Sequence, residues 1–477
     1  MGNVHGFSRD QISFQLLCLD EMIDKENPVR AIDAFVESLC LVDMGIKEYK
    51  KHNPGQQPYE RKDLLKLFIY GYFNKIRSSR SLEIECKRNI ELMWLVNGIR
   101  PDHGTISLFL KENRKGFKKV MRTFTYLLKG WGLIDGKLIA IDGTKIRAQN
   151  SKKNCITSNG LTKKMNYIDE KIEHYLQQLE QIAQENELTE ENVSSIESKI
   201  DKYQKKKEYL TEIKKKMNEE EKNQLTTTDP ESRAMKNNGK IDVAYNMQSS
   251  VDNKHKLIVT LDVVNDVNDQ SQLSPMVSKT NEILSKNTDR VIVADTGYYN
   301  AKEIKDCLDD GNTLYLKPQK KKSMSGDPTY SKDNFQYQKE TDSYRCPQGQ
   351  ELPYKENTSK NGLKYKRYIG GDVCLSCPVY SLCTKAKRGR NIQRWEHEEL
   401  IEKLKEDTEA NNEIYKKRSQ IVEHPFGTIK RSFGYTFFLG KGLDSVNAEA
   451  ALIGVAYNFK RLTKIKKISE IVELLVA

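Results

Sequence analysis

The N-terminal part of the chain carries the apolar pattern of packed helices. Between residues 58 and 130, apolar residues such as Leu64, Phe68 and Leu92 recur at mixed spacings of three and four. This spacing gathers apolar side chains on one face of each helix, so a shared core can form between the helices. We therefore expect a compact helical domain within residues 1–130.

Two further apolar stripes lie in a more polar stretch, residues 161–224. The first stripe includes Met165 and Ile172, the second includes Ile196 and Tyr203, and a polar run separates them. This pattern predicts two antiparallel helices that form an inserted coiled-coil hairpin. The charges of the hairpin nearly balance, which favours a projecting arm or a dimerisation element over direct binding to phosphate. A purely structural projection is the alternative.

Short apolar runs elsewhere predict the strands of an α/β core. The strand candidates are residues 138–141, 241–248, 257–264, 291–294 and 313–316. Helices are expected at residues 270–284, from Ala301 and at residues 412–430. This order of elements is typical of a mixed sheet covered by helices. We assign the first part of the core to residues 131–160 and 225–317.

Two of the strand candidates end in an acid, since Asp142 follows the first run and Asp295 follows the run 291–294. A carboxylate at the end of a buried strand is costly unless it is paired, hydrogen-bonded or metal-bound. A divalent cation held by two carboxylates is a recurrent solution in phosphoryl transfer. Gly143 and Gly297 would let a backbone or a substrate come close. The competing acids are Asp229, Asp242, Asp262, Asp266 and Asp269.

The composition indicates a class of partner. The 477-residue chain has 79 Lys and Arg against 67 Asp and Glu, a net charge of +12. The sequence pI of about 9.0 favours a polyanionic partner, with nucleic acid as the first candidate. No run approaches the roughly 18 apolar residues of a membrane span, and the N-terminus lacks the pattern of a signal peptide. We therefore expect no membrane association and a cytoplasmic protein that associates with the nucleoid.

Basic residues are concentrated in two places. A helix, a polar turn at residues 101–104 and a second, basic helix could dock on DNA, or could form an ordinary bundle with solvated lysines. Residues 317–390 hold 16 Lys and Arg against 7 Asp and Glu, interleaved with aromatic residues. That mixture suits phosphate contact and stacking, although a merely basic surface is the alternative. We treat residues 318–405 as an inserted basic segment and residues 406–477 as the closing helices.

Four of the nine cysteines lie in this basic insertion, namely Cys346, Cys374, Cys377 and Cys383. Nine cysteines are too few for a disulfide scaffold in so long a chain. Four thiolates can close a tetrahedral zinc site, and the Cys374-x-x-Cys377 spacing suits two ligands from one turn. Reduced packing thiols and a redox pair are the alternatives.

Three segments carry a resemblance to a known family: Ile141-Asp-Gly-Thr-Lys, Ala294-Asp-Thr-Gly-Tyr and Val422-Glu-His-Pro-Phe-Gly-Thr-Ile-Lys430. In this order they resemble the bacterial insertion-sequence transposases of the DDE superfamily, and the segment Pro101-Asp-His-Gly-Thr-Ile-Ser resembles the helical domain of that family. The resemblance implies an α/β fold with a ribonuclease-H-like mixed sheet and a helical N-terminal DNA-binding domain. It also implies that Asp142, Asp295 and Glu423 bind Mg²⁺ or Mn²⁺ and are catalytic.

The same resemblance implies the reaction. Such an enzyme binds the terminal inverted repeats of its element, cleaves the DNA at the element ends and joins the freed 3′-hydroxyl to target DNA. We therefore expect double-stranded DNA as partner, and a homodimer because both ends must be held together. Two metal ions suit the in-line displacement, and no phosphate-binding glycine loop occurs, so ATP is not expected. A nuclease of the same fold without strand transfer and a non-catalytic DNA-binding protein are the rivals.

The surroundings of the glutamate also follow a pattern of that family. It is Tyr, two residues, Arg, three residues, Glu, six residues, Lys, and it matches Tyr415, Arg418, Glu423 and Lys430 with one extra residue after the arginine. Five residues apart on one helix, Arg418 and Glu423 point well away from a common face. Pro425 predicts a kink or a fresh helix start.

Five residues are predicted to contact DNA, the first four in this region and the last in the segment Asp229-Pro-Glu-Ser-Arg233. They are Tyr415, Arg418, Lys430, Arg431 and Arg233. Solvated side chains are the alternative for the basic residues among them.

Overall fold

The computed structural model describes the chain with several gaps. The described residues are 18–47, 58–184, 190–237, 239–286, 289–318, 327–360 and 362–476. They form helices and a mixed sheet, so the predicted α/β class is confirmed. No helix among these residues is long and apolar enough to cross a membrane.

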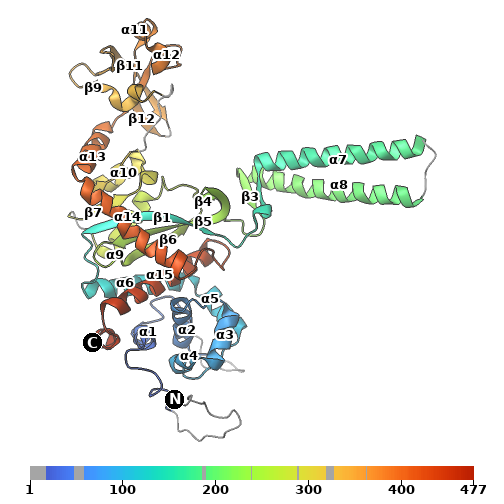
Figure 1. The fold of residues 1–477 in the computed structure, drawn as a ribbon, viewed down its shortest axis with the longest axis vertical. Coiled ribbons are helices and arrows are strands. Elements are labelled where there is room, and N and C mark those ends of the chain that lie inside the picture. The colour runs from blue at the N-terminus through green and yellow to red at the C-terminus, as the bar shows by residue number, and fades with distance from the viewer. Residues whose placement is uncertain are drawn as a thin grey trace, which may run out of the picture.

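The N-terminal helices form one packed unit at one end of the molecule (Figure 1). They are α1 (Pro28–Glu37), α2 (Arg61–Phe73), α3 (Ser79–Arg88), α4 (Ile90–Leu95), α5 (His103–Glu112) and α6 (Arg114–Gly130). Helix α2 lies at the centre, and nearly all of its residues are buried. The mixed spacing of apolar residues in the sequence follows from this central position, because a helix that is surrounded has no polar face.

The last two helices pack on this N-terminal unit, across the whole length of the chain. Helix α15 (Leu443–Ile465) contacts α2 and α6, and α16 (Ile468–Val476) contacts α1. The rings of Phe124 and Phe459 stack with their centroids 4.3 Å apart. Arg77 and the buried Glu449 form an ion pair at 2.9 Å. The predicted boundaries at residues 130 and 406 therefore separate elements that share one core.

The central sheet has the strand order of a ribonuclease-H-like core. Its strands are β1 (Leu138–Arg147), β4 (Arg233–Asn237), β5 (Lys240–Asp252), β6 (Ile258–Val264), β7 (Val291–Ala294) and β8 (Thr313–Tyr315). The order is β6-β5-β1-β7-β8, in which β5 is antiparallel to its neighbours and β1, β7 and β8 are parallel. The edge strand β4, which pairs with the start of β5, was not predicted because its residues are polar.

Helices α9 (Leu273–Leu284), α10 (Ala301–Asp309) and α14 (Asn412–Gly427) pack around this sheet, and α14 contacts β1, β5 and β7. Of the two outcomes predicted at Pro425, the fresh helix start is wrong, since Pro425 lies inside α14, and the kink stays a prediction. A π-helical turn, Thr428–Ser432, follows, and the Phe433 N–H donates to the Thr428 carbonyl at 2.8 Å. The buried side chains of Ile421, Val422 and Pro425 pack against the core and offset the lost backbone hydrogen bond.

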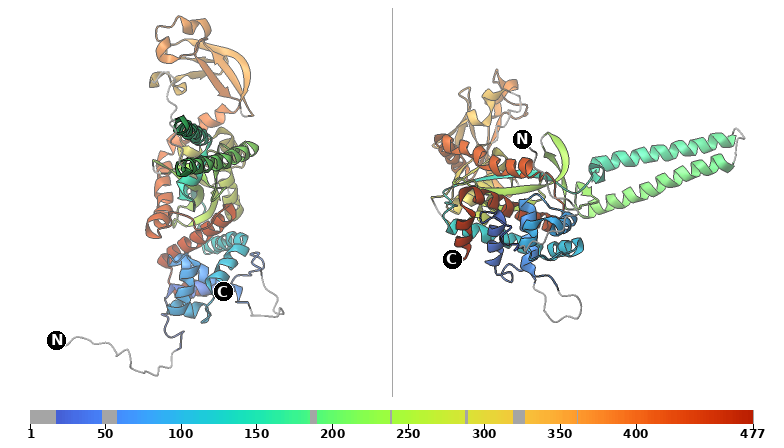
Figure 2. Two further views of the ribbon diagram at one scale, coloured as in Figure 1. Left: turned by 90° about the vertical axis from the view of Figure 1, so that its right-hand side faces the viewer. Right: turned by 60° about the horizontal axis from the view of Figure 1, so that its bottom comes forward.

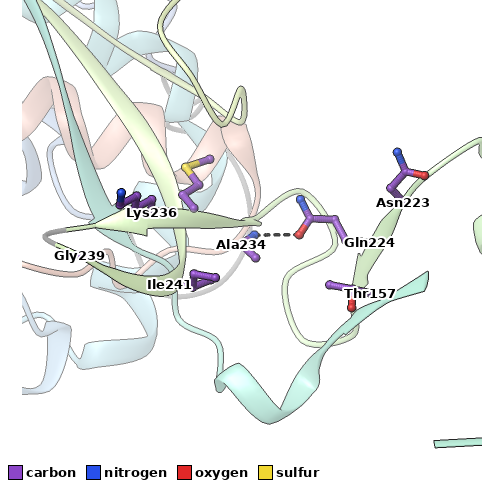
Figure 3. Close-up of a pocket in the computed structure, with 8 residues that line it drawn as sticks. Thr157, Asn223, Gln224, Ala234, Lys236, Gly239 and Ile241 are labelled. Atoms are coloured by element: carbon purple, nitrogen blue, oxygen red, sulfur yellow. Dashed lines mark hydrogen bonds between the residues drawn. The ribbon is translucent and has the colours of Figure 1, made fainter. Parts of the chain in front are cut away.

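The predicted hairpin is present as two long antiparallel helices, α7 (Ser158–Gln184) and α8 (Glu190–Glu219), which project sideways from the core (Figures 1 and 2). A short ladder of β2 (Cys155–Thr157) and β3 (Gln224–Thr226) joins the hairpin to the body. Figure 3 shows an open hollow at this root, where Gln224 accepts a hydrogen bond from the Ala234 N–H at 3.0 Å.

The basic insertion forms a small antiparallel sheet at the other end of the molecule (Figure 1). Its strands are β9 (Gln336–Gln338), β10 (Ser343–Arg345), β11 (Glu351–Lys360), β12 (Leu363–Ile369) and β13 (Asn391–Trp395). Two short helices, α11 (Gly371–Leu375) and α12 (Tyr380–Cys383), lie between β12 and β13. Helix α13 (Glu398–Ala410) contacts β8 and α10, so the chain is back at the core before residue 405.

Candidate active site

The ends of two parallel strands bring Asp142 and Asp295 together. Strands β1 and β7 are neighbours, and Ile141 is in register with Ala294. Each aspartate is the next residue along its strand, so the two acids lie side by side at one edge of the sheet. The three residues before each acid are all buried, as in a parallel sheet with both faces covered, and this packing holds the two strand ends in place.

Arg418 of α14 lies between the two acids. Its Nη1 is 3.3 Å from Oδ2 of Asp142, and its Nη2 is 3.6 Å from Oδ1 of Asp295. The guanidinium is largely buried, with 17% of the side chain exposed. A fork of parallel N–H groups on a carboxylate pair is a charge-assisted contact with a defined direction. This contact was not predicted, because it depends on how α14 crosses the sheet.

Asp142 holds its proton more strongly than an ordinary aspartic acid. Burial is the largest cause and raises the pKa of Asp142 to about 6. The Arg418 charge and the Gly143 N–H, which donates to Oδ1 at 2.8 Å, lower this pKa. Asp295 and Asp269 raise it by charge repulsion. A site with this balance favours an added cation, which would relieve the repulsion between the acids.

Asp269 is the third acid beside Asp142 and Asp295. Its Oδ1 accepts hydrogen bonds from Asn246 at 2.7 Å and from Gln248 at 2.8 Å, and Lys145 lies 3.1 Å away. Asn246 and Gln248 are fully buried on β5, two residues apart and therefore on one face of the strand. Polar side chains at alternate positions of an apolar strand need a buried polar partner. This signal in the sequence could have directed attention to an acid nearby, such as Asp269 among the five competing acids.

Gly143 is required by this polar cluster. A Cβ at residue 143 would lie 2.9 Å from Oδ1 of Asp269 and 3.1 Å from Oδ1 of Asn246, and it would overlap the amide of Gln248. Tyr298 also belongs to the cluster, because its hydroxyl donates a hydrogen bond to Oε1 of Gln248. Burial first, and then the charges of Asp269, Asp142 and Asp295, raise the pKa of Tyr298 well above its usual value. Tyr298 therefore stays protonated as a hydrogen-bond donor.

Glu423 stands apart from the two aspartates. It is exposed on α14 and has no hydrogen bond or ion pair among the described residues. The separation follows from helix geometry, since five residues place Glu423 about 140° around the axis from Arg418. Within the described ranges, no group of three or more His, Cys, Asp or Glu side chains is close enough to hold a metal ion. The structure thus joins two of the three predicted acids and brings Asp269 to them.

The predicted DNA contacts divide into two groups. Tyr415 lies beside Arg418, and burial raises the pKa of this tyrosine although the Arg418 charge opposes the shift. Lys430, in the π-helical turn, is partly buried, and burial together with the charge of Lys145 lowers its pKa. Arg431 is exposed next to it. Arg233 is elsewhere, and its Nη1 donates to the carbonyls of Pro230 and Ser232, so its predicted contact with DNA stays a prediction.

Some basic residues after the polar turn make contacts within the chain at its surface. Lys118 pairs with Asp262 at 2.8 Å, and Lys119 donates to the carbonyl of Asp43 at 3.1 Å. These two lysines favour the bundle interpretation for this part of α6.

The four cysteines of the insertion line one small enclosed space between α11, α12 and the loop after β10. All four are thiols, without a disulfide. Burial raises the pKa of Cys374 and of Cys383, and the other cysteines raise it further. The four sulfur-bearing side chains are therefore near enough to influence one another.

Two family models match the chain. Residues 17–112 match a family described as "Transposase domain (DUF772)", and residues 345–463 match one described as "Transposase DDE domain". These domains mark the chain as a DDE-type transposase. Glu423 and the four cysteines lie in the second match, whereas Asp142 and Asp295 lie between the two matches.

Further comparisons add little to this identification of a DDE-type transposase. No curated protein matches the chain. One solved structure is described as "Cryo-EM structure of piggyBac transposase synaptic complex with hairpin DNA (SNHP)". It is 8% identical, with 94% of this chain and 79% of that chain covered and a TM-score of 0.30. A similarity this low carries no argument about fold or function.

Proposed function

We propose that the transposase binds the terminal inverted repeats of an insertion sequence, cleaves the DNA at the element ends and joins the 3′-hydroxyl to target DNA. The observation that carries this proposal is the pair Asp142 and Asp295, held side by side under Arg418. The match to a DDE transposase domain supports the same reaction class. The net charge of +12 supports double-stranded DNA as the partner.

The two aspartates are the residues that would hold Mg²⁺ or Mn²⁺. Mg²⁺ prefers oxygen ligands and is commonly bound by one or two carboxylates together with the phosphates of the substrate. The position of the Arg418 cation between the acids shows that they jointly favour a positive charge. When bound, a pair of such ions would activate the attacking oxygen and stabilise the leaving oxygen.

The basic residues of α14 and of the turn after it would orient the DNA. The guanidinium of Arg418 can pair with a phosphate oxygen in the same two-pronged way that it now pairs with the acids. Lys430 and Arg431 are on the continuation of α14 and would neutralise phosphates beside the cleaved bond. Tyr415 lies next to Arg418 and would limit the movement of its side chain.

The third acid has two candidates. The resemblance favours Glu423, which would need to turn toward the aspartates when DNA binds, whereas the structure places Asp269 beside them. We propose that Glu423 is the third metal ligand. Asp269 would instead hold together the buried polar cluster next to the two aspartates. Glu423→Gln should then abolish cleavage and leave the thermal unfolding temperature unchanged, while Asp269→Asn should lower that temperature. Full cleavage activity of Glu423→Gln would mean that Asp269 is the third metal ligand.

We propose that two copies act together on DNA, because an element has two ends and each needs an active site. A mixture of wild-type protein with Asp142→Asn protein tests this arrangement. If each end needs its own intact site, joined products should fall with the square of the wild-type fraction. A linear fall would mean that one copy serves both ends.

The reaction is tested with a plasmid that carries the native flanks of the gene. Purified protein and Mg²⁺ should give free 3′ ends at the flanking repeats and joined products, and the Asp142→Ala variant should give neither. Cuts without joining would favour a nuclease of the same fold. Specific binding without any cut would favour a non-catalytic DNA-binding protein.

A further inference from the structure

The tip of the basic insertion gathers four thiols from three separate segments. Cys346 follows β10, Cys374 is in α11, Cys377 comes just after it, and Cys383 ends α12. All four line the same small enclosed space. We propose that this cluster is a structural zinc site with four cysteine ligands, independent of the proposed reaction at the two aspartates.

The backbone at the cluster forms two turns, one after Cys346 and one that holds both Cys374 and Cys377. The Gly349 N–H donates to the Cys346 carbonyl at 2.8 Å, which closes a tight turn after the first thiol. Gly349 has φ +78°, a conformation that other residues rarely adopt. The Cys377 N–H donates to the Cys374 carbonyl at 3.1 Å, so these two thiols share one turn. Such a Cys-x-x-Cys turn commonly supplies two of the four ligands of a structural zinc site, and Cys346 and Cys383 would supply the other two.

Two glycines make room for the thiol of Cys374. A Cβ at Gly370 would overlap the Sγ of Cys374, and a Cβ at Gly389 would lie 2.9 Å from the Cβ of Cys374. Gly389 also has φ +84°. The two glycines therefore let the chain pass close to the side chain of Cys374.

The insertion has little hydrophobic core to hold its fold. Its core cluster consists of five buried side chains, Phe335, Tyr344, Leu352, Tyr368 and Ile392. Cys346 and Cys383 pack against the edge of this cluster. A unit with so small a core generally needs a metal or disulfides to be stable, and zinc binding supplies folding free energy directly.

Zinc binding requires the thiols to close on the ion. The four side chains line one space, but no three of the described His, Cys, Asp or Glu groups lie at ion-holding distance. The proposal therefore requires zinc to draw the four sulfurs toward the centre of this space.

The test measures metal content in the full-length protein, purified without chelators. Mass spectrometry of the metal should find about one zinc per chain, the content of a single tetrahedral site. Cys377→Ser and Cys383→Ser should each lose most of it, whereas Cys307→Ser, which changes a buried cysteine of α10 outside the cluster, should retain it.

A second readout identifies the ligands. Protein refolded with Co²⁺ should show the absorption of a tetrahedral site with thiolate ligands, and the Cys377→Ser variant should not. The proposal is overturned if the wild-type protein contains no zinc while all four thiols react with a thiol reagent, or if a disulfide links two of them. Asp142→Ala protein should keep its zinc, so failure of the proposed reaction and failure of the zinc site are distinguishable.

Discussion

The aspartate site and the cysteine cluster are built in opposite ways. Asp142 and Asp295 are placed by strand register and by a large shared core, so the scaffold holds the acids before any cation arrives. The cysteines are placed by short turns around a core of five side chains, so the ion would hold the scaffold. One metal would therefore serve chemistry and the other stability, and each could be removed without the other.

The largest effect is expected from the acids themselves. Asp295→Asn should reduce cleavage by at least about 100-fold, because it removes one charged oxygen ligand from a site that acts by charge. The fold should remain, since Asp295 comes directly after β7 and about half of its side chain is exposed. Cleavage of an end substrate and circular dichroism check the two parts. Loss of the folded state would contradict the idea of a preformed site.

The second effect concerns the insertion. Removal of zinc by a strong chelator should open residues 327–397 to protease while the core stays resistant, because only the insertion depends on the ion. Mass spectrometry of the fragments locates the cuts. Equal resistance of the insertion to protease in chelator-treated and untreated protein would mean that its fold does not depend on zinc. The Cys377→Ser variant should be cut without chelator.

The third effect tests the close packing under the acids. Gly143→Ala should destabilise the protein by about 1–3 kcal/mol, because the added methyl group meets Asp269, Asn246 and Gln248. Gly130→Ala is the matched control, since nothing lies within 4 Å of a Cβ at that glycine. Urea unfolding measures both variants. Equal free energies of unfolding would mean that the cluster is loosely packed.

The fourth effect is a pH dependence of the metal-free protein. The pKa of Asp142 is raised to about 6 from an ordinary value of 3.8, so the folded state binds the proton more tightly than the unfolded state. Stability from this group is therefore present below pH 4 and is lost as the pH rises to about 6, by up to about 3 kcal/mol. Asp142→Asn should remove this dependence. The difference between the two proteins, followed by urea unfolding, should grow from pH 4 to pH 6 and then level off.

The smallest effect belongs to the charges beside the site. Arg431→Ala should weaken DNA binding by less than about 10-fold and lower the slope of affinity against salt by about one, because it removes one phosphate contact. Stability should not change, since the side chain is exposed. Binding assays at several salt concentrations measure the slope. An unchanged slope would mean that Arg431 is simply solvated.

The sequence was sufficient for features that depend on neighbouring residues. The apolar runs before Asp142 and Asp295 predicted strands β1 and β7, and the two stripes predicted α7 and α8. Long-range features were not predictable in this way. The contact of Arg418 with both acids depends on where α14 crosses the sheet.

Two further features show the same limit. Asp269 reaches the site because β5 pairs with β1 in one register, which places Asn246 and Gln248 beneath the loop that carries Asp269. The helix continues through Pro425 because tertiary packing outweighs local propensity. In each case the deciding interaction joins segments far apart in the chain.

Mn²⁺ binding tests whether Asp142 and Asp295 together hold the catalytic cation. Electron paramagnetic resonance can count bound Mn²⁺ in the presence of a duplex with the native end sequence. Wild-type protein and the surface control Glu282→Gln should bind Mn²⁺ equally, and Asp142→Asn and Asp295→Asn should each lose most of it. Undiminished Mn²⁺ binding in both aspartate variants would mean that Asp142 and Asp295 do not hold the cation.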